Sequence, residues 1–240
     1  MDYTNQVKKL VLGLGADLVG IADVKSLKGL KTIPPNLLDP FNTVLSIAMQ
    51  LPAAIFKQIV DQPTPNYASA YLTANRLLDE IAFKISNKME SDGYQSLPIP
   101  ASQALDKENW YAAISHKAVA FAAGIGWQGK NLLLITPEYG SRVRLVSVLT
   151  TALLNPDNPV ANRCGKCMAC RDACPVNAIK GINTQTHYEN RNQALFFDRC
   201  KDKLTKEFAQ LPDIGAPMCG LCIKACPFTR KSKKDKIIES

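Results

Sequence analysis

Eight cysteines are the residues of this 240-residue chain whose type and spacing are best suited to chemistry. All lie in the last third of the chain, in the segments RCGKCMACRDACP, FFDRC and MCGLCIKACPF. The N-terminal stretch MDYTNQVKKLVLGLGADLVG lacks the cleavage pattern of a secretory signal. We therefore expect a cytoplasmic protein, in which clustered cysteines bind metals more often than they form disulfides.

The first four cysteines are spaced as C-x2-C-x2-C-x3-C and are followed by Pro175. Bacterial ferredoxins use this spacing to hold 4Fe-4S clusters. Three thiolates two residues apart can wrap one cluster, and the following helical turn carries the fourth toward another cluster. Zinc is the rival interpretation, but zinc sites more usually use two separated C-x2-C pairs. The run therefore predicts an iron–sulfur site.

The remaining cysteines complete a second cluster. MCGLCIKACPF repeats the motif without its first cysteine, and Cys200 can fill that gap. The predicted ligands of one cluster are Cys164, Cys167, Cys170 and Cys226, and those of the other are Cys174, Cys200, Cys219 and Cys222. In the alternative interpretation Cys200 is an ordinary buried thiol, which would leave the second cluster with three protein ligands.

The chain is basic, with a formal net charge of +8. Eight thiolates and two oxidised cluster cores of about +2 each would reduce this net charge to about +4. Much of the excess lies in the C-terminal tail, at Arg230, Lys231, Lys233, Lys234 and Lys236. Such a tail could bind RNA or an acidic partner, although a solvated terminus is the commoner case. No uncharged apolar run is long enough to predict a membrane span.

A folded scaffold must position the cysteines, and hydrophobic periodicity predicts one. Helices are expected at residues 3–16, 66–89 and 115–123, and strands at 17–24, 42–51, 131–135 and 142–150. This alternation predicts an α/β layer domain. Because LNPDNPVANR is rich in Asn and Pro, we expect the α/β domain to cover residues 1–155. A ferredoxin-like domain with two 4Fe-4S clusters, held together by its metals, would cover residues 156–240.

A glycine-rich stretch, AGIGWQGKN (residues 123–131), lies upstream of the cysteines and is here called the glycine loop. Its glycines match a dinucleotide-binding fingerprint, and Gly124, Gly129 and Lys130 match the start of a P-loop. Both motifs require a strand before the loop and a helix after it, whereas here the helical SHKAVAFAA comes first. The P-loop also needs Ser or Thr where this chain has Asn131. The glycines therefore indicate either close approach of the backbone to a bulky ligand or a plain helix-to-strand turn.

The stretch SHKAVAFAAGIGWQGKNLLLITPEYGSRVRLVSVLTTALL, together with both cysteine motifs, resembles the epoxyqueuosine reductase family, which is related to the reductive dehalogenases. The resemblance covers residues 66–228 and is strongest at 115–150 and at the cysteines. It implies a nitroreductase-like α+β N-terminal domain, and a cobalamin-dependent oxidoreductase whose two clusters pass low-potential electrons to cobalt. The cofactor-binding residues that we assign on this basis are Gly124, Gly126, Trp127, Gly129, Lys130 and Asn131.

The chain departs from this family in two places. The family's catalytic aspartate lies in a VDxxP segment, and the matching SLPIP has Leu97 at that position. The family's helical-repeat region, which is associated with tRNA, does not follow the cysteines, so we expect tRNA not to be a partner. Tyr111, His116 and Tyr139 could supply a proton by their chemistry, but each is more often structural, and no catalytic residue is assigned.

Two functions of different classes follow from these features. In the first, the chain is an oxidoreductase that passes electrons through two clusters to a corrinoid and a small substrate. In the second, it is an electron-transfer protein that delivers electrons to a partner, such as a corrinoid protein, without substrate chemistry of its own. The glycine loop favours the first, whereas Leu97 and the basic tail favour the second. Both need a low-potential electron donor, and a redox sensor is a weaker third candidate.

Overall fold

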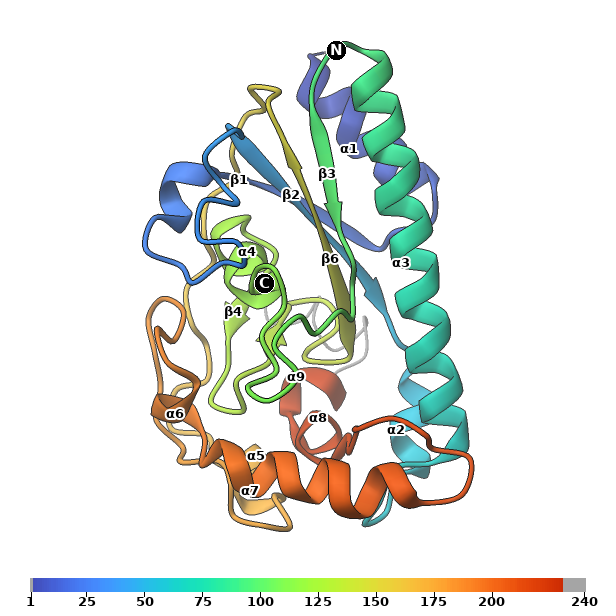
Figure 1. Cartoon of the computed structure of the whole chain (residues 1–240). Coiled ribbons are helices and arrows are strands. Elements are labelled where there is room, and N and C mark those ends of the chain that lie inside the picture. The colour runs from blue at the N-terminus through green and yellow to red at the C-terminus, as the bar shows by residue number, and fades with distance from the viewer. Residues whose placement is uncertain (1, 231–240) are drawn as a thin grey trace, which may run out of the picture. The chain divides into compact units, whose positions relative to one another are not determined.

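The computed structural model of this protein describes residues 2–230 (Figure 1). They form two compact units. The first, here called the sheet unit, comprises the residues up to 49 together with 74–126 and 144–160. The second, the cluster unit, comprises 50–73, 127–143 and the residues from 161 onward. Residues 50–73 and 127–143 thus belong to the same unit as the cysteines. The domain boundary expected between residues 155 and 156 does not include these two segments.

The sheet unit is built on a four-stranded sheet with the order β1-β2-β6-β3 (Figure 1). Its strands are β1 (Leu18–Asp23), β2 (Thr43–Gln50), β6 (Val143–Thr150) and β3 (Ser96–Ile99). β1 is antiparallel to β2, and β3 is antiparallel to β6. The predicted mixed α/β class is confirmed, with antiparallel neighbours as in an α+β fold.

Helices cover both faces of this sheet because side chains alternate across each strand. Leu45 and Ile47 of β2 point to one face, where they share a core with α1 (Tyr3–Gly13) and the later turns of α3 (Pro65–Ser91). Val44, which precedes Leu45, points to the other face, where it packs in a second core with α4 (His116–Ala122). These three helices are confirmed, with ends within a few residues of those predicted.

The strand predicted at residues 131–135 is mostly wrong. Only β5 (Leu134–Ile135) is extended, and it pairs with the two-residue strand β4 (Trp127–Gln128). The reason is local: Leu132 has a φ of 63°, and its N–H donates to the Gly129 carbonyl at 2.9 Å. A left-handed residue closes a turn and interrupts extended backbone. Strand β3 and helix α2 (Ala53–Gln58) were not predicted from the sequence.

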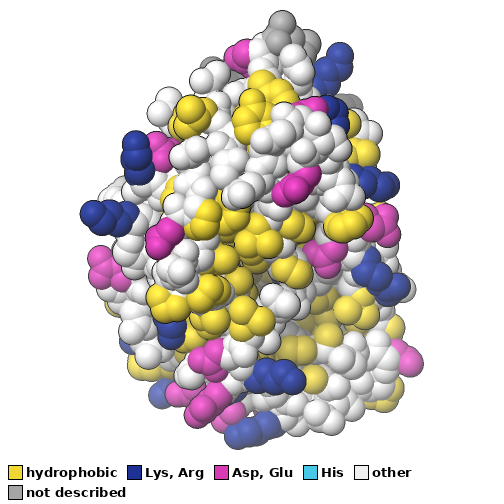
Figure 2. Space-filling view, turned by 45° about the horizontal axis from the view of Figure 1, so that its top comes forward, with side chains coloured by type: hydrophobic (Ala, Val, Ile, Leu, Met, Phe, Trp, Pro, Cys, Tyr) yellow, Lys and Arg dark blue, Asp and Glu magenta, His cyan; other side chains and the backbone are white. Residues whose placement is uncertain are grey.

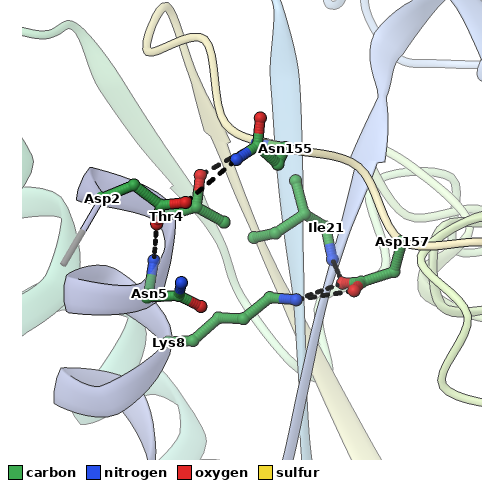
Figure 3. A network of polar contacts seen from close by, with 7 residues as sticks. All are labelled: Asp2, Thr4, Asn5, Lys8, Ile21, Asn155 and Asp157. Carbon is green, nitrogen blue, oxygen red and sulfur yellow. Dashed lines mark hydrogen bonds and ion pairs between the residues drawn. The ribbon is translucent and has the colours of Figure 1, made fainter.

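A polar network fixes the start of the Asn- and Pro-rich segment within the sheet unit (Figure 3). The Lys8 ammonium lies 2.6 and 2.7 Å from the two carboxylate oxygens of Asp157. The same carboxylate accepts a hydrogen bond of 2.8 Å from the Ile21 N–H. The backbone N–H of Asn155 donates to Thr4 Oγ1 at 2.9 Å. Residues 155–157 are therefore tied to α1 and β1.

The cluster unit contains mainly short helices. Beyond α2, they are α5 (Ala169–Asp172), α6 (Arg191–Ala194), α7 (Phe197–Asp202), α8 (Leu221–Ala225) and α9 (Pro227–Arg230). Of the basic tail, Lys231, Lys233, Lys234 and Lys236 lie outside the described residues. Within residues 2–230, no helix combines the length and apolar character that a membrane span requires.

Candidate metal centre

All eight cysteines lie in the cluster unit, and none forms a disulfide. Electrostatic interactions between their sulfurs divide them into two sets. Cys170 interacts with Cys164, Cys167 and Cys226, whereas Cys219 interacts with Cys174 and Cys200, and Cys222 with Cys174, Cys200 and Cys219. Cys222 also interacts with Cys170. This last interaction crosses between the sets and brings them close together, and the division of the ligands between two clusters stays a prediction.

Burial makes these thiols hard to ionise without a metal. It raises the pKa of Cys170 and of Cys219 to about 11, and neighbouring cysteines of the same set add to the rise by repulsion. The pKa of Cys222 is raised well above its ordinary value for the same two reasons. Thiolates are the form that binds iron. The donor set fits a cationic iron–sulfur core, because such a core offsets both the burial and the repulsion.

Among residues 2–230, no three His, Cys, Asp or Glu side chains are grouped closely enough to hold one metal ion. A cubane cluster instead places four thiolates on four separate iron atoms.

Local backbone features bring the cysteines into these sets. The helical turn of α5 separates Cys170 from Cys174, as the spacing predicted. At the start of α8, Gly220 has a φ of 87°, and a Cβ there would lie 2.5 Å from Ile59 Cδ1. Only glycine adopts this backbone and leaves that space. The tight turn lets Cys222 follow Cys219 around one cluster.

N–H groups donate to cysteine sulfurs in both sets. The indole N–H of Trp127 lies 3.4 Å from Cys164 Sγ. The backbone N–H of Ala178 lies 3.2 Å from Cys174 Sγ. Such hydrogen bonds stabilise charge on sulfur and raise the reduction potential of a cluster.

The side chains of the glycine loop support the first cysteine segment. Trp127 is fully buried, and its ring packs edge-on against Phe228 with centroids 4.9 Å apart. The buried Lys130 ammonium donates to the carbonyls of Gly165 and Cys167 at 2.8 and 3.0 Å. Trp127 and Lys130 therefore contact the loop that carries Cys164 and Cys167. The sequence suggested only a corrinoid for them.

The chain itself fills the space beside two of the loop glycines. A Cβ on Gly124, whose φ is 70°, would lie 2.4 Å from the Asn158 carbonyl oxygen. A Cβ on Gly129 would lie 2.4 Å from Ile135 Cδ1. Packing alone thus accounts for these two glycines, and their contact with a corrinoid stays a prediction.

Asn131 differs from the other loop residues. Its Oδ1 accepts a hydrogen bond of 3.2 Å from the Leu133 N–H. Its Nδ2 is buried and has no hydrogen-bond partner among the described residues. A buried amide donor without a partner costs roughly 1–3 kcal/mol, which a ligand acceptor would remove. The unpaired Asn131 Nδ2 could donate to an amide or phosphate oxygen of a bound corrinoid, so this residue fits such a cofactor.

Sequence reasoning missed Asn162 and Gln128. Asn162 Oδ1 accepts from the Cys164 N–H at 2.8 Å, and its amide nitrogen donates to the Gln128 and Thr184 carbonyls at 3.0 and 2.7 Å. Gln128 Oε1 accepts from the Tyr188 N–H at 2.7 Å. Together they clamp the backbone on either side of the first cysteine. No periodicity marks such residues, because the contacts join segments distant in the sequence.

Among the candidate proton donors, His116 has both ring nitrogens engaged. Nε2 lies 3.0 Å from the Pro100 carbonyl, which can only accept, so Nε2 carries the proton. Nδ1 then accepts from the Ser147 hydroxyl at 2.8 Å. Burial lowers the His116 pKa to about 4, and the Arg144 and Lys117 charges act in the same direction. A neutral imidazole with both ring nitrogens hydrogen-bonded favours a structural role for His116.

The position of the family's aspartate and the two tyrosine candidates have different surroundings. Leu97 lies on the edge strand β3, opposite Leu149, and is 37% exposed. The Lys31 ammonium lies 3.8 Å from the ring centroid of Tyr111. The Arg142 guanidinium lies 5.2 Å from the ring centroid of Tyr139. A catalytic residue remains unassigned.

Comparisons with known proteins agree with this geometry. Residues 163–229, which include every cysteine, match a family described as the 4Fe-4S double cluster binding domain. The epoxyqueuosine reductase of Listeria monocytogenes is 38% identical over 118 residues, covering 49% of this chain and 30% of the relative. That of Aliivibrio fischeri is 29% identical over 253 residues, covering 97% and 62%. The chain thus spans less than two thirds of either relative.

Solved structures share the fold over nearly the whole chain. A catabolic reductive dehalogenase in complex with 3-bromo-4-hydroxybenzoic acid has a TM-score of 0.73 at 18% identity, covering 97% of this chain and 32% of that one. A selenomethionine-labelled epoxyqueuosine reductase has a TM-score of 0.66 at 24% identity, covering 95% and 66%. An epoxyqueuosine reductase with an epoxyqueuosine-modified tRNA stem loop has a TM-score of 0.64 at 23% identity, covering 95% and 65%.

Replacing Trp127 with Phe should lower the reduction potential of one cluster. The substitution keeps an aromatic ring against Phe228 but removes the N–H that donates to Cys164 Sγ. Loss of about 1 kcal/mol corresponds to a shift of about 40 mV for one electron. Redox titration followed by electron paramagnetic resonance measures it. Trp110→Phe, at the other tryptophan, is the control, and equal potentials in all three proteins would contradict the prediction.

Between pH 6.5 and 5, the unfolding free energy of the protein should fall partly because of His116. Its pKa is lowered in the folded state, so the unfolded chain binds the proton first as the pH falls. The contribution is complete above about pH 6.5 and is lost toward pH 4, with a slope of up to ~1.4 kcal/mol per pH unit. Urea unfolding at several pH values should show a shallower slope for His116→Asn, but an unchanged slope for His187→Asn.

Proposed function

We propose that this chain, which is similar to epoxyqueuosine reductases and matches a 4Fe-4S double cluster binding domain, is an oxidoreductase that passes low-potential electrons through two 4Fe-4S clusters to a corrinoid and a small substrate. The observation that carries the proposal is the close approach of the two cysteine sets. Cys170 of one set interacts electrostatically with Cys222 of the other. Two clusters held this close would form a relay for single electrons.

Each cluster takes its ligands from both cysteine motifs. The first is held by Cys164, Cys167, Cys170 and Cys226, and the second by Cys174, Cys200, Cys219 and Cys222. Sulfur interactions within each set support this assignment. Crossed ligation of this kind ties α5 to α8 and would stabilise the cluster unit when iron is present.

The corrinoid would use the glycine loop. When bound, it supplies a cobalt centre that accepts electrons at low potential. Asn131 would donate its orphaned amide N–H to an acceptor on the corrinoid, while Trp127 and Lys130 hold the adjacent cysteine loop. The chain has only two histidines, and neither lies in the D-x-H-x-x-G pattern by which some proteins supply the lower ligand of cobalt. Protein imidazole ligation is therefore not part of the proposal.

The substrate is proposed to differ from epoxyqueuosine in tRNA. Leu97 has no proton to give at the position of the family aspartate. A nucleic-acid site would also be expected to show a basic stripe. On the face in Figure 2, Lys and Arg side chains lie among Asp and Glu side chains. Among the described side chains on that face, no basic stripe is seen.

A second candidate is an electron-transfer protein without substrate chemistry of its own. The neutral His116 and the aliphatic Leu97 favour it, because an oxidoreductase that opens a carbon–oxygen bond needs a positioned acid. Retention of a corrinoid separates the two candidates.

Anaerobic reconstitution should give about eight iron atoms per chain. Cys200→Ala should remove one cluster and leave about four, because only the second set loses a ligand. Cys167→Ala should remove the other cluster, which makes it the matched variant. Iron and sulfide analysis with Mössbauer spectroscopy gives the count. About four iron atoms in the unaltered protein, or loss of both clusters in either variant, would be the contrary result.

The reconstituted protein should retain cobalamin through gel filtration. Asn131→Leu, which keeps the volume but removes the amide donor, should weaken retention by about tenfold or more without changing the iron content. Asn87→Leu, on an exposed part of α3, is the control. Absence of cobalamin from the unaltered protein would favour the electron-transfer candidate.

Epoxyqueuosine in tRNA should not be turned over efficiently by this protein. A positioned acid typically contributes about a hundred- to ten-thousandfold to the rate, and Leu97 cannot provide it. An anaerobic assay with strong reductant, cobalamin and modified tRNA, followed by nucleoside analysis, measures the product. Leu97→Asp tests whether an acid restores activity. Turnover by the unaltered protein equal to that of a full-length family member would refute the prediction.

A further inference from the structure

An exposed aromatic ring with two cations over it lies next to the second cysteine set. The Phe196 side chain is 46% exposed, although phenylalanine is among the residue types most often buried. The Lys180 ammonium lies 4.6 Å from its ring centroid, and the Arg199 guanidinium lies 4.5 Å from it. We call Lys180, Phe196 and Arg199 the basic–aromatic patch. All three residues belong to the cluster unit.

Two consecutive hydrogen bonds connect this patch to a cysteine sulfur. The Phe196 N–H donates to the Ala178 carbonyl at 2.8 Å. The Ala178 N–H donates to Cys174 Sγ at 3.2 Å. The patch is therefore linked through the backbone of Ala178 to one predicted ligand of the second cluster.

The chain continues from the patch to another predicted ligand. Arg199 immediately precedes Cys200 on helix α7. Phe197, which follows Phe196, packs against the same apolar group as Cys174 and Cys222. A protein seated on the patch would thus lie over the second set.

The patch carries positive charge where the cluster itself would be negative. Between residue 178 and the end of α7 at residue 202 there are four basic side chains, Lys180, Arg191, Arg199 and Lys201, against the acidic Glu189, Asp198 and Asp202, a net of +1. Four thiolates around an oxidised core would carry about −2. Without these cations, an acidic partner would be repelled from the cluster it must reach.

We propose that the basic–aromatic patch is the docking surface for an acidic, low-potential electron-carrier protein of the flavodoxin or ferredoxin type. The inference rests on the proposed function, in which the clusters receive electrons from outside. The carrier gives up one electron, and the second cluster takes it up as its core goes from the 2+ to the 1+ state. No proton or other group is transferred in this step.

The surroundings favour a protein over RNA at this surface. Asp198 and Asp202 lie on the same short helix as Arg199 and would repel a phosphate backbone. A protein carrier can place basic side chains opposite these two carboxylates. Phe196 supplies the apolar centre that transient protein interfaces commonly have.

The first test measures binding of a reduced or oxidised flavodoxin to the reconstituted protein by calorimetry at several salt concentrations. The paired variant Lys180→Gln/Arg199→Gln should weaken binding about tenfold at low salt and flatten the dependence of the affinity on salt. The control is Arg76→Gln/Lys84→Gln, which removes the same charge from exposed positions on α3. Phe196→Ser should weaken binding while keeping the backbone bond to Ala178. Equal affinity in all variants overturns the docking surface.

The second test follows cluster reduction by stopped-flow absorbance. Reduced flavodoxin should bleach the clusters of the paired variant about tenfold more slowly than those of the unaltered protein, while dithionite should reduce both equally. Slow reduction of the variant by dithionite would mean a damaged cluster and would overturn the docking role. Clusters that dithionite reduces in neither protein would overturn the proposed function, while the binding test still decides the docking surface. Loss of RNA binding in the variant with unchanged flavodoxin rates would assign the surface to RNA instead.

Discussion

The structure of the cluster unit depends on one electrostatic constraint, which is that its cysteine sulfurs are gathered where thiolates are costly. Burial and mutual repulsion raise the pKa of Cys170, Cys219 and Cys222, so these groups can be charged together only around a cationic core. The short helices of this unit provide little apolar burial of their own. Metal binding and folding are therefore linked in this part of the chain.

The side chains of the glycine loop lower the cost of placing negative charge on the cysteine sulfurs. Trp127 donates an N–H to a cysteine sulfur, and Lys130 places a buried positive charge beside the loop of Cys164 and Cys167. Both interactions favour negative charge on the cluster. The residues that resemble a cofactor-binding motif thus act first on the iron–sulfur site, and Asn131 is left as the donor for a further ligand.

The sheet unit shows the opposite character. Its cores are apolar and continuous across both faces of the sheet, and its histidine is neutral and doubly hydrogen-bonded. The position of the family's acid is taken by Leu97 on an edge strand. Redox chemistry is therefore well supported by the residues present, whereas proton transfer is not.

The sequence by itself determined the cysteine motifs, the α/β class and the principal helices and strands, because each depends on local spacing or on hydrophobic periodicity. It also indicated the two cysteine sets, since the motif fixes which cysteines stay near one another. Only the tertiary structure decided the roles of Trp127, Lys130 and Asn162, each of which has a partner 34 to 37 residues away in the sequence. It also decided that segments 50–73 and 127–143 join the cluster unit. Such contacts depend on which distant surfaces meet, and neither periodicity nor motif spacing records that.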